Sequence, residues 1–578
     1  MQPKVAVPLG REGGQKVAML VILDGKDGRL AFQKPQAVIR ADSAAAVPVA
    51  LAAMEAAHAA GRWLAGAFAY ELGYALEPRL AALMPSSPQA LIVFGVYDAP
   101  AADVPKPAGR AYAGPLRPEW DAADYSSRFR AVKEALVAGD IYQANLSFRA
   151  AFAFAGNPRA LYEQLRTVSA APHCAFIDLQ DGGARQILSL SPELFFEMQG
   201  GHIRARPMKG TAARQGDDAL GRAALAGSAK DRAENLMIVD LIRNDVGRIA
   251  QIGSVGVEDL FAIETYPSLH TMVSTVTARL RPDTDIAAIV QALFPCGSIT
   301  GAPKIRAMEI LRQLESSPRG AYCGAIGYFA PDQSARFNVA IRTLTITGQS
   351  GTLGIGGGVV QDSREASEYA ECLLKARFFE AARRPLELIE TLKWQGDFIR
   401  LERHLARMAA SAKLFGLAFD DSLARQALAD AIAGGAGALR VRLALNEAGM
   451  FQAVAAPLAE NPPHWTYDIS PVRLDSDDLL LRHKTSWREL YDAPHAGDEV
   501  VFLNERGEVA EGARSNLFVR REGKLLTPPL SVGLLPGILR AEMLEGGDCE
   551  EAVLTQSDLD GEVFFGNSLR GLIPAKRL

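Results

Sequence analysis

Cysteine is scarce in this chain, and its placement excludes two common uses. Five cysteines occur among 578 residues. They are scattered without a CxxC pair, at Cys174, Cys296, Cys323, Cys372 and Cys549. A disulfide framework or a zinc knuckle needs closely spaced cysteines, so neither is indicated. We therefore expect a reducing, cytoplasmic environment.

Long apolar runs and long runs of one charge are also missing. Residues 1–14 have no apolar stretch behind their charges, and the apolar stretch 17–23 is too short to cross a bilayer. Lysine and arginine number 62 against 67 aspartates and glutamates, which gives a net charge of −5. The composition argues against a membrane protein and against a nucleic-acid surface, so any anionic ligand must be met by a local site.

The chain also lacks internal repeats and low-complexity tracts, which excludes solenoids and disordered linkers. Its 578 residues are too many for one ordinary core, so we expect at least two domains. A long helical pattern over 365–382 is followed by Arg383-Arg384-Pro385 and a strand-like run over 386–391. We place the boundary there and predict one domain over residues 1–380 and a second over 381–578.

Both domains are predicted to be of the α+β class, with a large antiparallel sheet in the first. The helices expected in the first domain are residues 123–138, 218–226, 286–293 and 304–314. The strands expected there are 186–190, 271–280, 340–347 and 352–360. The second domain is expected to have a helix over 400–417 and short strands around 438–445, 452–456 and 499–503.

One lysine is notable for its neighbours. Lys209 stands between Pro207 and Gly210 and beside the apolar Met208, on what the pattern predicts to be a tight turn. A lysine desolvated in such surroundings can lose its proton near neutral pH and act as a nucleophile. A turn of this kind also commonly carries a solvated surface lysine, so the local sequence leaves both interpretations open.

Two predicted helices carry carboxylates on one face. Asp231 and Glu234 are three residues apart, and Glu368, Glu371 and Lys375 fall at i, i+3 and i+7. Two such faces together could hold one Mg²⁺, a hard ion that binds carboxylate oxygens and would bridge to a carboxylate of a substrate. Ordinary charge pairs on helix surfaces have the same spacing, and this alternative remains open.

The run 353–360 is rich in glycine and superficially suggests a dinucleotide-binding fingerprint. The glycines continue into Val359 and Val360 rather than into a helix, so we reject that interpretation. Glycines within a strand allow close backbone approach, and the amides of Gly357 and Gly358 could meet a carboxylate. The run 294–304 leads into a predicted helix and could bind an anion through its amides and hydroxyls.

Several motifs occur in an order that resembles the chorismate-utilising enzymes. They are Pro207-Met208-Lys209-Gly210-Thr211, the run 234–245, the run 297–306, Ala340-Ile341-Arg342-Thr343-Leu344 and the helix over 368–375. The resemblance covers most of residues 30–378. Within that superfamily, the aminodeoxychorismate synthase component I branch has a lysine at the position of Lys209, whereas anthranilate synthase component I has a small residue. The chain therefore resembles the aminodeoxychorismate branch.

The resemblance implies roles for residues of the first domain. Lys209 would attack C2 of chorismate, Glu193 would protonate the departing C4 hydroxyl, and ammonia would enter at C4. Glu234 and Glu371 would bind Mg²⁺, with Asp231 and Glu368 in support. The further substrate contacts that it implies are Arg342, Lys375, Tyr328, His270, Ser298, Thr300 and the amides of Gly357 and Gly358. Glu193 as a capping carboxylate and His270 as an ordinary interior histidine remain alternatives.

The source of ammonia is a separate question. A glutamine amidotransferase needs a Cys-His-Glu arrangement with a nucleophilic cysteine flanked by glycines. Neither Cys296 nor Cys174 stands in such a context. The resemblance therefore implies a separate glutamine amidotransferase subunit as partner.

The second domain carries scattered residues that together suggest pyridoxal phosphate. Arg407 stands in a predicted helix, Lys484 and Glu511 follow, and the run 534–540 leads into another helix. This set offers a lysine for a Schiff base, a carboxylate for the pyridine nitrogen, and an arginine with helix N-terminal amides for phosphate. Ordinary surface charges would explain each residue taken alone.

Residues 386–578 resemble the fold-type IV pyridoxal phosphate enzymes, which include branched-chain aminotransferases and aminodeoxychorismate lyase. The resemblance implies Arg407 as the phosphate arginine, Lys484 as the Schiff-base lysine and Glu511 as the partner of the pyridine nitrogen. Further cofactor contacts would come from Gly537, Ile538 and Ser568. The usual N-terminal strands of this family are missing or shortened, so the domain would borrow a surface from its neighbour or from a second subunit, as in a homodimer.

The resemblances together predict a bifunctional enzyme that makes 4-aminobenzoate from chorismate and ammonia for folate synthesis. Two alternatives stay open. The chain could be an anthranilate synthase component I fused to an aminotransferase-like domain, although Lys209 argues against it. The second domain could also be a non-catalytic scaffold.

Overall fold

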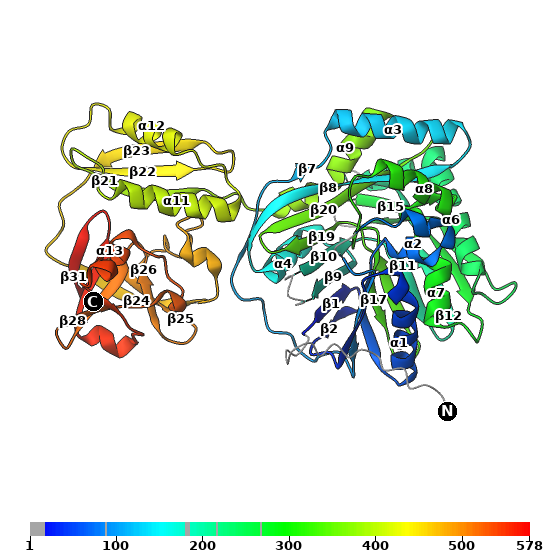
Figure 1. Cartoon of the computed structure of the whole chain (residues 1–578), viewed down its shortest axis with the longest axis horizontal. Helices are drawn as coiled ribbons and strands as arrows, with labels where there is room; N and C mark the ends of the chain where they lie inside the picture. The colour runs from blue at the N-terminus through cyan, green and yellow to red at the C-terminus, as the bar shows by residue number, and fades with distance from the viewer. Residues whose placement is uncertain (1–17, 87–88, 180–184, 215–217, 266–268) are drawn as a thin grey trace. The chain divides into compact units, whose positions relative to one another are not determined.

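The computed structural model describes residues 18–86, 89–179, 185–214, 218–265 and 269–578 (Figure 1). The expectation for residues 1–14 lies outside these ranges. The chain divides into two compact units, each described separately below. The first comprises residues up to 105, 116–152 and 162–382, and the second comprises 106–115, 153–161 and 383–578. None of the helices in the described ranges is both long and apolar enough to cross a membrane.

The first unit is built on two large β-sheets in which antiparallel pairs predominate, as the sequence predicted. One sheet has the strand order β16 (Gly301–Ala302), β8 (Gln143–Gly156), β20 (Ser350–Val359), β19 (Thr343–Thr347), β10 (Arg185–Ser191), β9 (His173–Asp178), β1 (Leu20–Gly25) and β2 (Gly28–Phe32), with β7 (Arg117–Pro118) also paired to β8. The other has the order β13 (Met208–Ala213), β15 (Leu269–Arg279), β12 (His202–Arg206), β11 (Leu194–Gln199), β18 (Ala335–Val339), β17 (Ala325–Phe329), β4 (Trp63–Phe68), β5 (Ile92–Tyr97) and β3 (Ala37–Ala41), with β14 (Gly256–Thr265) paired to β15.

Helices accompany these sheets and carry several candidate site residues. They are α1 (Val47–Ala59), α2 (Leu72–Leu76), α3 (Ala122–Val137), α4 (Pro158–Ser169), α5 (Asp218–Gly227), α6 (Ala229–Gly247), α7 (Ile286–Leu293), α8 (Lys304–Leu314), α9 (Glu365–Lys375) and α10 (Arg377–Ala382). Their ends follow simple chemistry. At the start of α7, for example, the side chain of Asp285 accepts a hydrogen bond from the amide of Ala288 at 2.7 Å.

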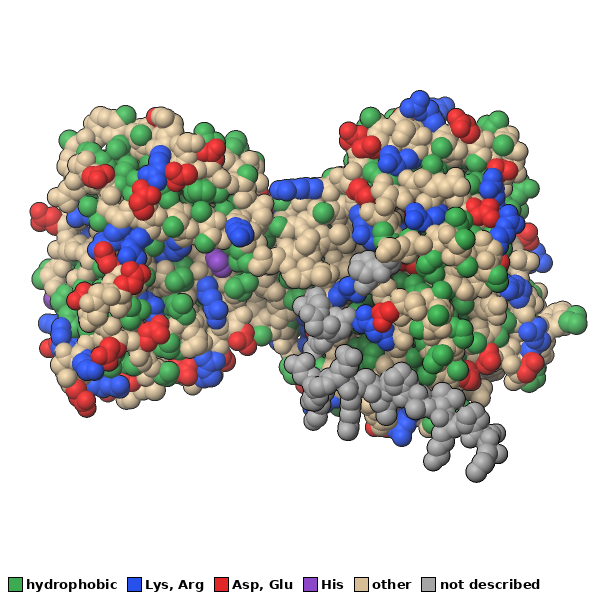
Figure 2. Space-filling model, viewed as in Figure 1, with side chains coloured by type: hydrophobic (Ala, Val, Ile, Leu, Met, Phe, Trp, Pro, Cys, Tyr) green, Lys and Arg blue, Asp and Glu red, His purple; other side chains and the backbone are tan. Residues whose placement is uncertain are grey.

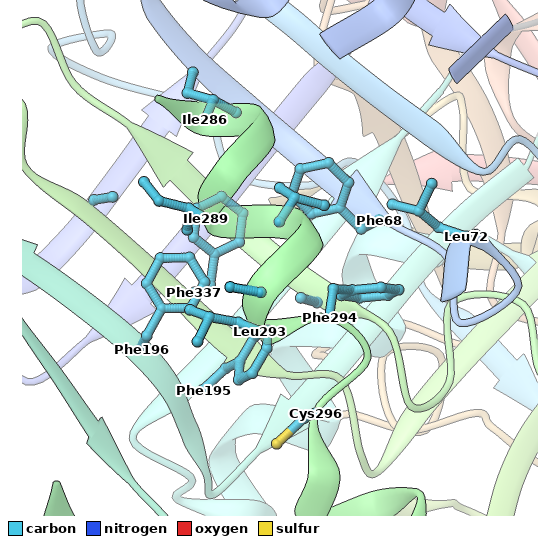
Figure 3. Packing of buried hydrophobic residues seen from close by; sticks show 14 of the residues in the cluster. Phe68, Leu72, Phe195, Phe196, Ile286, Ile289, Leu293, Phe294, Cys296 and Phe337 are labelled. Atoms are coloured by element: carbon cyan, nitrogen blue, oxygen red, sulfur yellow. The ribbon is translucent and has the colours of Figure 1, made fainter. Parts of the chain in front are cut away.

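An aromatic core holds the strand that follows Glu193. Figure 3 shows side chains of α7 beside a group of phenylalanines. Phe196 of β11 stacks on Phe337 of β18 with ring centroids 5.0 Å apart, and Phe337 lies 5.8 Å from Phe68 of β4. All three rings are nearly inaccessible to solvent, and a buried phenylalanine contributes about 1.5–3 kcal/mol of hydrophobic free energy. This packing fixes β11 and with it the turn that bears Glu193.

The second unit combines a small and a larger sheet. The small one has the order β21 (Leu388–Trp394), β22 (Leu439–Leu445) and β23 (Phe451–Pro457), and the helices α11 (Leu401–Phe415) and α12 (Asp421–Ile432) pack on it. The larger has the order β26 (Val509–Gly512), β25 (Glu499–Asn504), β24 (Trp465–Leu474), β31 (Gly571–Arg577), β30 (Glu562–Asn567), β27 (Asn516–Arg521), β28 (Lys524–Thr527) and β29 (Glu550–Glu551). The helix α13 (Ile538–Gly546) packs on β30, and the short strand β6 (Ala111–Ala113) also belongs to this unit.

The α+β class predicted for both domains is confirmed. Charged side chains of both signs are interspersed on the face of each unit seen in Figure 2, in line with the balanced composition. One local prediction was wrong, because Lys209 lies in strand β13 and not on a tight turn. The predicted helix over 365–382 is divided into α9 and α10, since the amide of Ala376 turns back to the carbonyls of Leu373 and Leu374.

Glycine is required where neighbouring strands of the second sheet meet, and this gives a test of the fold. A β-carbon on Gly327 of β17 would stand 2.0 Å from the carbonyl oxygen of Arg336. We expect Gly327→Ala to lower the free energy of unfolding by about 1–3 kcal/mol, the usual cost of overpacking. Gly227→Ala is the matched control, because a β-carbon there meets no atom within 4 Å. Calorimetric melting of both variants checks this, and equal stability of the two would contradict it.

Candidate functional site

Lys209 is presented by a β-bulge. It lies opposite Met272 in β15, and the register shifts immediately after it at Gly210, whose φ is +77°. A β-carbon on Gly210 would also lie 2.9 Å from the carboxylate of Asp231, so only glycine fits. Bulges turn a side chain away from the regular pleat of a strand. The partly buried ammonium group of Lys209 donates to the carbonyl of Ser298 at 3.3 Å.

Glu193 lies in the turn between β10 and β11 and is 4% exposed. Its carboxylate accepts a hydrogen bond from the hydroxyl of Ser298 at 2.8 Å, and its amide donates to the hydroxyl of Ser191 at 3.2 Å. Burial raises the pKa of Glu193 to about 7, although Ser298 and the nearby charge of Lys209 act in the other direction. Glu193 can therefore hold a proton near neutral pH.

The pKa values of Lys209 and Glu193 are shifted in opposite directions. Burial lowers the pKa of Lys209, the negative charge of Glu193 works against this shift, and the positive charge of Lys375 adds to it. Both groups also contact Ser298. A neutral amine beside a protonated carboxyl is the arrangement that a nucleophile and a general acid need.

Carboxylates from two helices act on the same lysine. Glu234 of α6 and Glu371 of α9 both raise the pKa of Lys209, which places their charges near its amine. The pKa of Glu234 is raised by burial and by the charges of Asp231 and Glu368, against the opposing effect of Lys209. For Glu371, burial is outweighed by an ion pair of 2.9 Å with Lys375, so that its pKa is lowered.

The predicted magnesium ligands fit a site in which the protein supplies few of the ligands to the ion. In the described ranges, no three His, Cys, Asp or Glu side chains gather closely enough to hold a metal ion by themselves. Magnesium commonly uses one or two carboxylates together with water and substrate oxygens, so Glu234 and Glu371 suffice in number. The repulsion that Asp231 and Glu368 exert on Glu234 is the kind that a cation would relieve. Glu368 itself accepts a hydrogen bond from Ser363 at 2.7 Å.

The glycines of β20 lie between these groups. A β-carbon on Gly357 would stand 3.5 Å from Glu368 and 3.7 Å from the amine of Lys375, whose ammonium donates to the carbonyl of Gly356 at 3.1 Å. A β-carbon on Gly358 would stand 3.5 Å from the amine of Lys209 and 3.3 Å from the amide nitrogen of Gln143. A side chain at either glycine would thus contact the groups beside it.

Four other predicted contacts have separate surroundings. Arg342 is largely buried, which lowers its pKa, and no carboxylate of the described ranges pairs with it. The hydroxyl of Thr300 donates to the carbonyl of Cys296 at 2.8 Å. His270 lies 2.9 Å from the hydroxyl of Thr265 and 3.5 Å from the carboxylate of Asp218. The ring of Tyr328 lies beside that of Trp63, with the ring centroids 5.5 Å apart. Among these four, Arg342 has the chemistry to bind an anion.

The second unit gathers its own set of charges around Lys484. Burial, together with the charges of Arg407 and Arg488, lowers the pKa of Lys484 to about 8, although Glu390 and Glu511 oppose the shift. Burial raises the pKa of Glu511 to about 7, although it accepts hydrogen bonds from Tyr491 at 2.7 Å and from the amide of Leu535 at 3.0 Å. The predicted lysine, carboxylate and arginine are thus brought together.

A buried ion-pair network fixes Arg407. Its guanidinium donates two hydrogen bonds to Glu390, at 2.8 and 2.7 Å, and one to the carbonyl of Pro536 at 2.9 Å. His404 contacts the same carboxylate at 2.7 Å and the hydroxyl of Ser568 at 2.8 Å. Burial of Glu390 is outweighed by these partners, and its pKa falls to about 2.

These residues fit pyridoxal phosphate. Arg407 uses three of its five N–H donors, which leaves two for an anion. Its partner Pro536 directly precedes Gly537, which caps the N-terminus of α13, so the amides of Gly537 and Ile538 face the same region as a helix N-terminal anion site. The amine of Lys484 has no hydrogen-bond partner among the described residues and is available for a Schiff base.

Several residues near Lys209 and Lys484 were not identified from the sequence. The side chain of Gln143 is 1% exposed, and neither its nitrogen nor its oxygen has a partner among the described residues. Such a group suits a substrate as its partner. Glu390, Tyr491 and Arg488 were also missed. The predicted strand 386–391 carries two glutamates, Glu387 and Glu390, and its sequence does not distinguish the buried Glu390 from the other.

Two family models match consecutive parts of the chain. Residues 11–381 match the model of the chorismate binding enzyme family, and residues 387–578 match that of amino-transferase class IV. The aminodeoxychorismate synthase component 1 of Klebsiella aerogenes is 48% identical over 251 residues, which are 43% of this chain and 55% of that protein. The anthranilate synthase component 1 of Methanothermobacter marburgensis is 38% identical over 248 residues, 42% of this chain and 53% of that protein.

The chain thus spans about half the length of the curated relatives that it matches. Among solved structures, anthranilate synthase component I from Streptococcus pneumoniae TIGR4 superposes with a TM-score of 0.51 at 23% identity. The superposition covers 65% of this chain and 94% of that one. At this identity the likeness concerns the fold.

The shifted pKa of Lys209 gives a test of the site that needs no substrate. Because the positive charge of Lys375 lowers the pKa of Lys209, Lys375→Met should raise it. The variant should therefore need a higher pH for half-maximal acylation of Lys209, as measured by mass spectrometry of labelled peptides. Lys413→Met, in a helix of the second unit, is the control. A midpoint that stays in place or falls would disprove the arrangement.

Proposed function

The chain belongs to the chorismate binding enzyme family, and from that premise we propose that it is a bifunctional enzyme that makes 4-aminobenzoate from chorismate and ammonia. The observation that carries the proposal is the pairing of Lys209, whose pKa is lowered, with Glu193, whose pKa is raised to about 7, beside the carboxylates of α6 and α9. The first unit would convert chorismate to 4-amino-4-deoxychorismate. The second would release pyruvate from that product.

The first reaction uses Lys209 as a nucleophile. Its neutral amine bonds to C2 of chorismate, both ring double bonds shift by one position, and the C4–O bond breaks. Glu193 donates its proton to the departing hydroxyl, which leaves as water. Ammonia then bonds to C4, both double bonds shift back, and the C2–N bond breaks to restore Lys209, while the proton released from the ammonia nitrogen returns to Glu193. Covalent catalysis divides one difficult substitution into two easier ones.

The anionic groups of chorismate would be met by several residues of the first unit. Arg342 offers a largely buried guanidinium without a carboxylate partner in the described ranges, and the amine of Lys375 would lie 3.7 Å from a β-carbon on Gly357. Glu234 and Glu371 would hold Mg²⁺, with Asp231 and Glu368 in support. When bound, the ion would supply positive charge for a substrate carboxylate.

Ammonia would come from a separate glutamine amidotransferase subunit, since the sequence carries no amidotransferase pattern of its own. The five cysteines are all buried free thiols, which fits the predicted reducing, cytoplasmic compartment. Association into a homodimer remains part of the proposal, because it would supply a second surface to the shortened second domain.

The second reaction would use pyridoxal phosphate, held by Lys484, Glu511, Arg407, the amides of Gly537 and Ile538, and Ser568. When bound, this cofactor supplies an electron sink for charge that develops on carbon. Lys484 would remove the proton from C4 of the aminated substrate, the C3–O bond would break, and the same proton would pass to the departing enolpyruvyl group, which leaves as pyruvate. Glu511, with Tyr491 as its hydrogen-bond partner, would hold a proton opposite the pyridine nitrogen.

Both alternative functions meet a specific objection. An anthranilate synthase would not need the lysine at position 209, by the resemblance that distinguishes the two branches. A scaffold domain would not need a buried lysine whose pKa is lowered to about 8, as in Lys484, near a glutamate whose pKa is raised to about 7, as in Glu511. Opposed shifts of this kind are typical of reactive sites.

Lys209→Ala tests the first reaction. With chorismate, Mg²⁺ and ammonium, the wild-type chain should form 4-amino-4-deoxychorismate. The variant should lose at least about 100-fold in kcat, since it lacks the nucleophile. Chromatographic identification of the products provides the measurement. Anthranilate as the main wild-type product, or full activity in Lys209→Ala, would refute the assignment.

Lys484→Ala tests the second reaction independently. This variant should lose the visible absorbance of a pyridoxal phosphate Schiff base and should release no pyruvate, because it lacks the amine for the linkage. It should still consume chorismate and accumulate the aminated intermediate. Absorbance titration and a coupled pyruvate assay measure these properties. Unchanged pyruvate release in the variant would disprove the role of Lys484.

A further inference from the structure

A segment from the first third of the chain belongs to the second unit. Residues 106–115 group with residues 383–578, and β6 within them pairs with the end of β8, where Tyr112 lies opposite Ala155. The amide of Asn157 donates to the carbonyl of Arg110 at 3.0 Å. At Gly156, where φ is +97°, a β-carbon would stand 2.2 Å from that same carbonyl oxygen. The segment is therefore held tightly.

The segment binds the turn that leads to Lys484. The amide of Gly109 donates to Asp475 at 2.6 Å, and the guanidinium of Arg110 donates to the second carboxylate oxygen of Asp478 at 2.7 Å. The first oxygen of Asp478 caps the short helix Leu479–Arg482 through the amide of Leu480 at 2.9 Å. Asp478 is 6% exposed, so without Arg110 one of its oxygens would be buried and unpaired. Lys484 follows this helix by two residues.

The segment also contacts the chain beyond Lys484. Tyr112 is fully buried, and its ring lies 5.1 Å from that of Phe415 and 6.2 Å from that of Trp487. Its hydroxyl donates to Glu447 at 3.0 Å. Trp487 is in turn fixed by a hydrogen bond of 2.9 Å from its indole nitrogen to the carbonyl of Pro385. The stretch that contains Lys484 is therefore held on both sides.

The side chain of Lys484 has no hydrogen bond of its own among the described residues. Its position depends on its backbone, whose carbonyl accepts from the amide of Ile389 at 2.8 Å, and on the two flanks. The charge of Arg110 also acts on Tyr491, which donates to Glu511. Arg110 thus acts on both reactive groups of the second site through other residues.

We propose that Arg110 is a positioning residue of the second site, which fixes Lys484 through its ion pair with Asp478. The inference rests on the proposed function, because it assigns Lys484 to cofactor binding. Loss of the ion pair would loosen the turn, admit water to the amine and misplace it relative to the cofactor. Small misplacements of a reactive group reduce its effectiveness strongly.

The test compares Arg110→Met, Asp478→Asn and the double variant in the full chain. Arg110→Met should weaken pyridoxal phosphate binding roughly tenfold, as measured by absorbance titration. It should also raise the pKa of Lys484 toward that of a solvated lysine, as measured by the pH dependence of its acylation without cofactor. Arg110→Lys, which keeps the charge, should restore part of both. The double variant should bind pyridoxal phosphate no more weakly than the single variant with the lower affinity, because both substitutions remove the same contact.

Arg521→Met is the matched control, since Arg521 pairs at 3.0 Å with Asp558, another capping carboxylate of a short helix in this unit. It should leave both measurements at wild-type values. Wild-type affinity and an unchanged pKa of Lys484 in Arg110→Met would overturn the inference while the proposed function stands. A wild-type chain that shows no Schiff-base absorbance would overturn both. Should Arg110→Met fail to fold, Arg110→Lys and Asp478→Asn decide by the same two measurements.

Discussion

Removal of water from a lysine amine is the interaction on which both sites depend. Lys209 and Lys484 are each surrounded by enough protein to lower the pKa, and in each case a glutamate near the amine opposes the shift. Burial raises the pKa values of those glutamates, Glu193 and Glu511, to about 7. Burial thus acts on both members of each group at once and favours the uncharged amine together with the protonated acid. The rest of each unit shields the lysine amine and the glutamate carboxyl from water and holds them in position.

The two units reach this state by different means. In the first, glycines of β13 and β20 let backbone approach Lys209 where side chains would stand. In the second, Glu390 and Arg407, which are ion-paired with each other, both act on the charge of Lys484. The first arrangement relies on close backbone packing, and the second relies on ion pairs.

Local patterns in the sequence were enough for the α+β class and for most helices, whereas the roles of the candidate site residues came from the family resemblance and stay predictions. The local patterns failed at Lys209, because a proline followed by a glycine is also compatible with a bulged strand, and only the pairing with β15 decides between the two. Gln143 gave no signal, since its importance lies in the missing partners of a buried amide. The contact of Arg110 with Asp478 joins residues 368 positions apart, and no local pattern reports on such a separation.

Strand β8 begins with Gln143, whose amide nitrogen would lie 3.3 Å from a β-carbon on Gly358, and ends at Gly156, against the backbone of Arg110. Side chains alternate between the faces of a strand, so a one-residue insertion or deletion within β8 would turn every later side chain to the opposite face. A change that left one end in register would therefore displace the other. The length of β8 is thus constrained at both of its ends at once.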